Sequence, residues 1–154
     1  MNQHPITVIQ AGRRDLHAIH EILAADAEER EASAQDAIQE FDEALAHDDF
    51  LSRDYFWILL AMQDGKVVGY LSAVKIPKGD KAKLFIYVDE LWVLRSHRRK
   101  GAGRALIERI EAIGREAGAY GIRLTTEFEN STAQAFYRKM GFRLKKDYFC
   151  EKVC

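Results

Sequence analysis

Apolar residues in the first third of the chain recur at the spacing of helices. The first helix is expected to run to about Arg30, with an apolar face made by Leu16, Ile19 and Leu23. A second helix is expected after Ser33, which with Asp36 has the spacing of a capping box in which Asp replaces the usual Glu or Gln. Its buried face is expected to consist of Ala34, Ile38, Phe41 and Leu45.

Six segments carry the continuous or alternating apolar patterns that are typical of strands. Two of them are joined by Asp64-Gly65, which is a strong signal for a tight β-hairpin. The next connection, residues 77–83, is a polar loop. The expected strands cover residues 6–10, 55–62, 67–76, 84–94, 122–128 and 144–153.

Two more helices are expected between the later strands. The first has an apolar face and ends before Gly118; this face is made by Leu106, Ile110, Ile113 and Ala117. The second is expected to start at a capping box of Ser131 and Gln134 and to end at Gly141. Its inner face consists of Ala133, Phe136, Tyr137 and Met140. The order β-α-α-β-β-β-α-β-α-β predicts an α/β (α+β) fold, a mixed sheet with helices on both faces.

Length and composition are those of one globular domain covering residues 1–154. The chain is 47% hydrophobic and 31% charged, and no apolar run approaches the roughly 20 residues that a membrane span needs. The N-terminus lacks a signal-peptide core, so we expect a cytoplasmic protein with no membrane partner. Cys150 and Cys154 are expected to be reduced thiols, because no neighbouring His or Cys completes a metal site.

The net charge is only −1, but acidic and basic residues are segregated along the chain. Residues 26–54 contain eleven acidic residues against two arginines, whereas residues 75–109 contain ten Lys or Arg against four acidic residues. The acidic segment fits a region that concentrates a cationic substrate, and the basic segment fits one that faces an anionic ligand. The acidic residues of 26–54 are equally consistent with the solvent-exposed faces of helices.

The most informative motif lies between the expected strand 84–94 and the helix after it. A strand that turns through glycines into a helix presents free backbone N–H groups at the positive end of the helix dipole, which is a ready site for phosphate. Gly101 and Gly103 lack a Cβ atom, so a pyrophosphate can approach the backbone closely. Charge would be added by Arg98, Arg99, Lys100 and Arg104. These residues predict a bound phosphorylated cofactor.

Two common phosphate-binding motifs do not fit this turn. The dinucleotide fingerprint needs a third glycine where this chain has Leu106. The ATP-binding P-loop needs Gly-Lys followed by Ser or Thr, and the sequence has no such triplet. Neither a dinucleotide nor ATP is therefore the expected ligand.

The pattern Arg98-x-x-Gly101-x-Gly103, preceded by Leu91-Trp92-Val93, resembles the signature of the GCN5-related N-acetyltransferases (GNAT). A second match lies about thirty residues further on, where Asn130 opens a helix that closes with Phe136-Tyr137-x-x-x-Gly141-Phe142. The resemblance covers the C-terminal half by motif and the N-terminal half by layout. It implies a mostly antiparallel central sheet and an enzyme that transfers an acetyl group from acetyl-CoA to a primary amine by direct attack in a ternary complex. The residues that it assigns to the cofactor are Leu91, Trp92, Val93, Arg98, Arg99, Lys100, Gly101, Ala102, Gly103, Arg104, Asn130 and Tyr137.

Amine attack on a thioester needs a base, and the resemblance places an acidic residue immediately before Leu91 or one position earlier. Glu90 is the preferred candidate and Asp89 the second, with Glu127 and Glu129 as further carboxylates. Neighbouring strand residues point to opposite faces, although a bulge would upset this count. A backbone N–H of residues 91–94 is expected to bind the oxyanion.

Tyr137 is the candidate general acid for the thiolate, and the alternative is an ordinary buried tyrosine. Asn130 is expected to contact the cofactor, to cap its helix, or both. Some relatives carry a catalytic Glu five residues before this Asn, where this chain has Thr125, so that base is not carried over.

The acceptor is left open by the sequence. Residues 86–105 and 118–120 look similar to a branch that contains aminoglycoside 3-N-acetyltransferases, which favours a small polycationic amine such as an aminoglycoside or polyamine. A protein amino group and a catalytically inactive sensor of coenzyme A are alternatives. Nucleic acid is not an expected partner, because residues 95–100 are basic but the chain is neither basic overall nor rich in interleaved aromatics. Homodimers are common in the family, and nothing in the sequence marks an interface.

Overall fold

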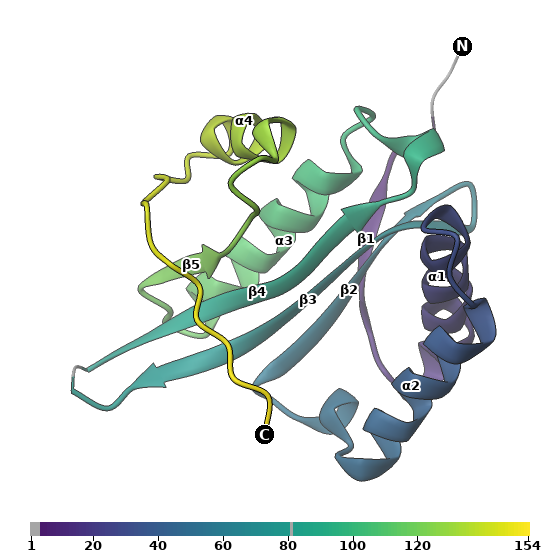
Figure 1. The fold of residues 1–154 in the computed structure, drawn as a ribbon, viewed down its shortest axis with the longest axis horizontal. Helices are drawn as coiled ribbons and strands as arrows, with labels where there is room; N and C mark the ends of the chain where they lie inside the picture. The colour runs from purple at the N-terminus through teal and green to yellow at the C-terminus, as the bar shows by residue number, and fades with distance from the viewer. Residues whose placement is uncertain (1–3, 81) are drawn as a thin grey trace. The chain divides into compact units, whose positions relative to one another are not determined.

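A five-stranded sheet dominates the computed structural model, which describes residues 4–80 and 82–154 (Figure 1). The strands are β1 (Thr7–Ala11), β2 (Phe56–Gln63), β3 (Lys66–Lys78), β4 (Lys83–Val93) and β5 (Gly121–Leu124), in that spatial order. The first four are antiparallel, and β5 runs parallel to β4. The chain forms two compact units, one that ends at Leu124 and one from Thr125 to Cys154.

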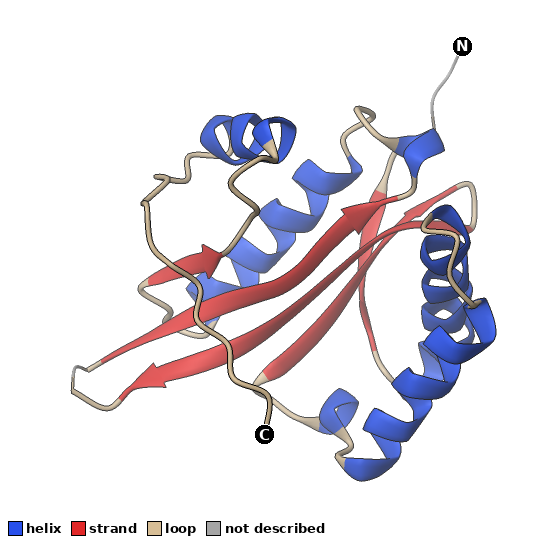
Figure 2. Ribbon diagram, viewed as in Figure 1, coloured by secondary structure: helices blue, strands red, loops and turns tan. Residues whose placement is uncertain are grey.

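Helices cover both faces of this sheet (Figures 1 and 2). On one face, α1 (Leu16–Glu29) and α2 (Ala34–His47) pack together, and the buried residues Ile19 and Ile22 join Ile58 and Leu60 of β2 in one hydrophobic core. On the other face lies α3 (Ala102–Glu116). The predicted fold class is confirmed.

Helix α3 packs closely against the strands beneath it. Leu106, Ile107 and Ile110 of α3 are fully buried, and each such side chain contributes about 1.5–3 kcal/mol to folding. A Cβ atom on Gly69 would lie 3.3 Å from Leu106 Cδ1, and one on Gly114 would lie 3.2 Å from Ile122 Cδ1. These glycines let the helix approach the sheet. Since β2 and β3 are covered on both sides, their sequences are almost continuously apolar.

Helix starts and turns follow local chemistry. Ser33 Oγ accepts the Asp36 N–H at 3.2 Å and so caps α2 as predicted. Asp64 and Gly65 both have positive φ angles, 52° and 73°, as the predicted tight hairpin requires. The predicted polar loop before β4 is shorter than expected, because the strands on either side extend to Lys78 and from Lys83.

The second unit departs from the prediction at three points. The predicted strand 122–128 ends at Leu124, because the carbonyl groups of Glu127 and Phe128 accept hydrogen bonds at the start of α4 (Ser131–Lys139). The predicted capping box of Ser131 and Gln134 is wrong: Asn130 is the cap, and its Oδ1 accepts the Ala133 N–H at 3.0 Å.

The predicted last strand, 144–153, is also wrong. No residue of this segment is in a strand, and Tyr148, Phe149 and Val153 are 98%, 75% and 87% exposed. An alternating apolar pattern becomes a strand only when a neighbouring edge accepts its hydrogen bonds, and among the described residues no strand pairs with this segment.

Candidate active site

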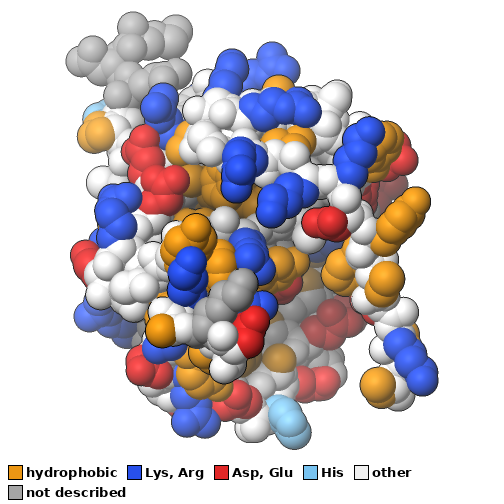
Figure 3. Space-filling view, turned by 90° about the vertical axis from the view of Figure 1, so that its left-hand side faces the viewer, with side chains coloured by type: hydrophobic (Ala, Val, Ile, Leu, Met, Phe, Trp, Pro, Cys, Tyr) orange, Lys and Arg blue, Asp and Glu red, His pale blue; other side chains and the backbone are white. Residues whose placement is uncertain are grey.

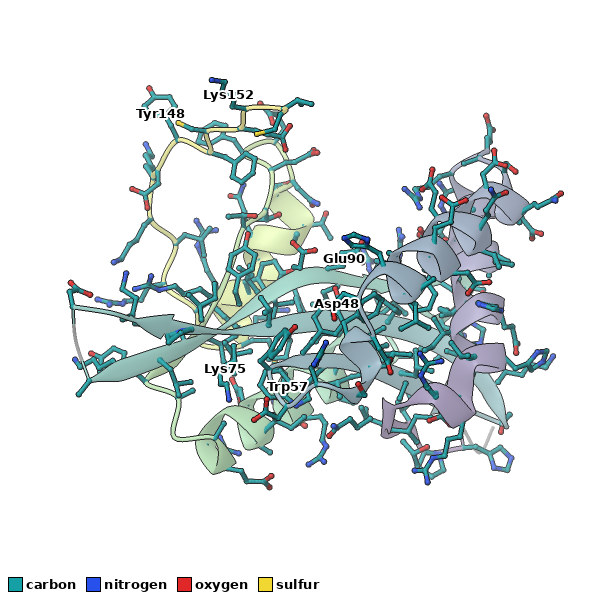
Figure 4. The ribbon with its side chains drawn as sticks, turned by 90° about the horizontal axis from the view of Figure 1, so that it is seen from below. Asp48, Trp57, Lys75, Glu90, Tyr148 and Lys152 are labelled. Carbon is teal, nitrogen blue, oxygen red and sulfur yellow. The ribbon has the colours of Figure 1, made fainter. Side chains whose placement is uncertain are left out.

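A β-bulge in β4 sets the orientation of the two predicted carboxylates. Val88 pairs with Ala73 and Glu90 with Ser72, so Asp89 is the extra residue of the bulge. The bulge places Glu90 on the face of the sheet that α1 covers, where its partner Ser72 also lies. Figure 4 shows Glu90 on one side of the sheet and Trp57 on the other.

Hydroxyl and charged groups surround the Glu90 carboxylate. Its Oε2 accepts a hydrogen bond from Ser72 Oγ at 3.4 Å, and the buried Tyr70 lies on the same face of the sheet. The charges of Asp89, Asp26 and Arg30 also act on it, the last two from the C-terminal end of α1, where they form an ion pair. Sequence reasoning did not single out Ser72, Tyr70 or Asp26.

The pKa of Glu90 is raised above its usual value. Desolvation by the surrounding protein is the main cause, and repulsion from Asp89 adds to it, whereas the Ser72 hydrogen bond lowers the pKa. The side chain is nevertheless exposed to solvent, so the carboxylate combines access for a substrate with a raised pKa. A carboxylate with a raised pKa is a stronger proton acceptor than an ordinary Glu.

The residues after Glu90 lie on alternate faces. Trp92 stacks on Tyr70, with ring centroids 5.1 Å apart and an interplanar angle of 18°, beside the carboxylate. Leu91 and Val93 pair with Leu71 and Gly69 on the face that packs against α3. Trp92 therefore lies on the same face as Glu90, and the two aliphatic residues are partly buried on the opposite face.

The glycine turn leads from β4 into α3. Arg99 has a φ of 59° and Gly101, at the N-cap position, a φ of 93°. No side chain caps this helix and no acidic residue lies in its first turn. The N–H groups of Ala102, Gly103 and Arg104 therefore point out of the helix end with no side-chain acceptor, as an anion-binding site requires.

Basic side chains flank this helix end, and three of them are held by hydrogen bonds. Arg98 Nε donates to the Val93 carbonyl at 2.9 Å, and Lys100 Nζ donates to the Ser96 carbonyl at 2.8 Å. Arg104 Nε contacts Glu108 Oε1 at 2.9 Å. The contact of Arg98 ties the turn to the end of β4 and leaves its other N–H groups for an anion.

A contact that sequence reasoning missed joins α1 to this turn. Glu29 Oε1 accepts the N–H of Arg95 at 2.8 Å, across 66 positions of sequence. Arg95 begins the short 3-10 helix Arg95–His97 that precedes the glycines. The helix that faces Glu90 and the segment that forms the anion site are thus connected directly.

The edge of β4 beside the site is open towards β5 in the first unit. β5 pairs with β4 only from Phe85 to Val88, while β4 continues to Val93. Beyond Val88 the strand is paired on its β3 side alone within this unit. Its outward backbone groups lie between Glu90 and the glycine turn, where the predicted oxyanion donor was placed.

Two predicted site residues belong to the second unit. Asn130 is the cap of α4, as described above. Tyr137 is buried, and its ring lies between those of Phe136 and Phe142, at centroid distances of 5.3 and 5.6 Å. Burial raises its pKa, so the hydroxyl is protonated at neutral pH and is able to donate a proton. The cofactor contacts of both residues stay predictions.

Two shallow surface hollows lie elsewhere among the described residues. One is lined by residues 10–14 and Leu51 and the other by three acidic residues and Gln39 of α2, and neither shares a residue with β4 or the turn. In the described part of the chain no cluster of three His, Cys, Asp or Glu could hold a metal. None of the helices in residues 4–80 and 82–154 is long and apolar enough to cross a membrane. The face in Figure 3 mixes Lys and Arg with acidic and hydrophobic side chains.

Comparison with known proteins identifies the class to which this fold and site belong. Residues 16–142 match the Acetyltransferase (GNAT) family, and the chain belongs to that family. An uncharacterised N-acetyltransferase of Mycobacterium bovis is 32% identical over 87 residues, which are 56% of this chain and 53% of that protein. Human N-acetyltransferase 8 is 29% identical over 62% of this chain and 41% of its own. The match thus spans about half the length of these curated relatives.

Solved structures show the same fold over nearly the whole chain. An aminoglycoside acetyltransferase from an uncultured soil metagenomic sample has a TM-score of 0.79 and 29% identity, and covers 97% of this chain and 99% of its own. AAC(6′)-Iy, solved with a bisubstrate analogue of coenzyme A, has a TM-score of 0.77 at 21% identity, with 97% and 99% covered. The predicted family resemblance is therefore confirmed.

Proposed function

We propose that this protein is an N-acetyltransferase that moves the acetyl group of acetyl-CoA to a primary amine. The observation that carries the proposal is the uncapped start of α3, flanked by four basic residues and reached directly from the strand that carries Glu90. A pyrophosphate fits this helix end, because its free N–H groups and positive dipole favour an anion. Acetyl-CoA supplies the activated acyl group.

In the proposed mechanism Glu90 accepts the proton of the attacking amine, directly or through water. The amine nitrogen forms a bond to the acyl carbon, the carbon–sulfur bond breaks, and Tyr137 donates a proton to the departing thiolate. A backbone N–H of the unpaired part of β4 stabilises the oxyanion, an interaction that contributes roughly 3 kcal/mol in enzymes. Asp89, Glu127 or water is the alternative base.

The proposed acceptor is a small cationic amine. Glu90, Asp89 and Asp26 place three carboxylates near one another, with Arg30 as the basic partner of Asp26. Such a site favours a substrate that carries several positive charges. Its structural neighbours include an aminoglycoside acetyltransferase solved with sisomicin, at 16% identity and a TM-score of 0.77. An aminoglycoside or a polyamine is therefore the class to test first.

The experiment is a panel of amines assayed by thiol release, together with calorimetric titration of acetyl-CoA. Aminoglycosides, polyamines and Lys-containing peptides would be compared. We expect acetyl-CoA to bind and at least one polycationic amine to release coenzyme A. Turnover of peptides alone would indicate a protein acetyltransferase, and binding without any turnover would indicate a sensor. No binding of acetyl-CoA would refute the proposal.

The role of Glu90 is tested by Glu90→Gln, with Asp89→Asn as the matched control. Loss of the base should lower kcat about 100-fold, while the affinity for acetyl-CoA stays within about twofold. The raised pKa predicts that wild-type kcat/KM falls with falling pH at a higher pH than for an ordinary Glu. Wild-type turnover in Glu90→Gln, or a larger loss in Asp89→Asn, would move the role to another group.

Glu90→Gln also has an expected effect on stability. A carboxyl whose pKa is higher in the folded than in the unfolded protein destabilises the fold as the pH rises through the range above the usual Glu value. The Gln variant should therefore have an equal or higher Tm at neutral pH. A falling Tm would show that Glu90 has a structural role instead.

A further inference from the structure

Two polar side chains of β3 are buried near Glu90. Ser72 is 3% exposed, and among the described residues it is the one polar side chain apart from Tyr in the buried set. Tyr70, two residues earlier on β3, is also 3% exposed, and its ring is fixed by stacking on Trp92. Both lie on the face of the sheet that carries Glu90.

The Ser72 hydroxyl is the donor in its contact with Glu90. A serine hydroxyl has one proton, and in Ser72 it is donated to Glu90 Oε2 at 3.4 Å. Because Ser72 is buried, water has little access to this hydroxyl.

We propose that Ser72 is a positioning residue for Glu90, which it orients through its hydroxyl group. This inference rests on the proposed role of Glu90 as the base. The Ser72 hydroxyl holds one carboxylate oxygen by a hydrogen bond and leaves the other free to accept the proton of the amine. The bulge at Asp89 makes this contact possible, because it brings Glu90 opposite Ser72.

The other charged groups near the carboxylate act differently. Asp89 on β4 and Asp26 on α1 raise the pKa of Glu90, and Arg30 on α1 lowers it. These side chains act on Glu90 through their charges alone, whereas Ser72 also contacts it by a hydrogen bond. Removing the serine hydroxyl should therefore change both the pKa of Glu90 and its orientation.

The test is Ser72→Ala, with Ser72→Thr to restore the hydroxyl and Ser52→Ala as a control serine that lies outside the site. In Ser72→Ala the acid limb of the pH profile of kcat/KM should move to higher pH. At pH values on that limb kcat should fall about fivefold, while the KM for acetyl-CoA stays unchanged. Ser72→Thr should return the limb to its wild-type position. An unchanged pH profile in a folded Ser72→Ala protein would overturn the proposal.

Ser72→Cys gives a second route if Ser72→Ala does not fold. This change keeps a side chain of similar size and replaces the hydroxyl by a weaker donor, so the acid limb should move in the same direction by a smaller amount. An acid limb that does not move, or that moves to lower pH, would overturn the proposal.

A readout that does not depend on turnover separates this proposal from the proposed function. The carboxyl carbon of Glu90 can be titrated by NMR in wild-type protein and in Ser72→Ala, with Glu90→Gln to assign the signal. A higher pKa of Glu90 in Ser72→Ala supports the proposal even if no amine is acetylated. An equal pKa refutes it even if the enzyme is active.

Discussion

Two helices of this protein begin in opposite ways. At the start of α4, Asn130 Oδ1 accepts the N–H of Ala133, and Gln134 Nε2 donates to the Phe128 carbonyl at 2.7 Å. At the start of α3, Gly101 has no side chain to offer and the N–H groups of the first turn have no side-chain partner. The first arrangement completes a helix with the chain's own groups, and the second leaves donors for a ligand. An uncapped helix among basic residues is thus a stronger indication of binding than the glycines by themselves.

The largest expected effect comes from blocking the open end of α3. Gly103→Val places a branched side chain where the pyrophosphate must approach the backbone, so several charge-assisted hydrogen bonds of about 1.5–3 kcal/mol each would be lost. We expect the affinity for acetyl-CoA to fall at least about 100-fold in calorimetry, with the fold intact by circular dichroism.

Gly79→Val is the matched control for this substitution. A side chain on Gly79 meets open space and its φ is not positive, so binding should stay at the wild-type level. If Gly103→Val bound acetyl-CoA as tightly as wild type, the open end of α3 would not be the cofactor site.

A smaller effect is expected from the arginine that fastens the turn. Arg98→Ala removes a positive charge and the 2.9 Å hydrogen bond to the Val93 carbonyl. The affinity for acetyl-CoA should fall about tenfold, and its dependence on salt should weaken. Arg98→Lys should recover only part of the loss, because Lys lacks the planar donor set of Arg. Full recovery with Lys would show that charge alone matters.

The smallest effect is expected at the capped helix. Asn130→Ala should lower the free energy of unfolding by about 1 kcal/mol, as the loss of an N-cap does, whereas Asn130→Asp keeps an oxygen acceptor and should retain stability. Chemical denaturation measures both. With the cap intact, Asn130→Asp should also keep its affinity for acetyl-CoA. A loss of affinity in that variant would assign a cofactor contact to the Asn130 amide nitrogen.

Sequence reasoning predicted the helices from their periodic apolar faces and the first four strands from continuous or alternating apolar runs. The glycine turn before α3 was also predicted from the sequence, since its glycines and arginines are adjacent along the chain. The bulge in β4 was anticipated only as a complication, because no residue type marks it. The contact between Glu29 and the Arg95 N–H joins distant segments, so no local pattern could reveal it.

The wrong or missing predictions concern features that a local sequence pattern does not determine. The strand predicted over 144–153 has a correct alternating pattern, but a strand also needs an edge to pair with, and the pattern contains no information about that edge. The capping box of Ser131 and Gln134 was placed one residue late, because Asn130 and Ser131 are both good caps. The contact between Ser72 and Glu90 was not predicted, because a single serine in an apolar strand carries no pattern that indicates a partner.

The extra residue at Asp89 has a consequence for how this strand can change during evolution. Side chains alternate along a strand, and the bulge shifts this alternation by one position. Deleting Asp89 would leave Glu90 directly after Val88 and still opposite Ser72, so the later side chains would keep their faces. Deleting Leu91 instead would turn Trp92 under α3, because no bulge absorbs that loss. This strand can therefore lose one particular codon and keep its reactive surface, whereas the loss of a codon two positions later would bury part of it.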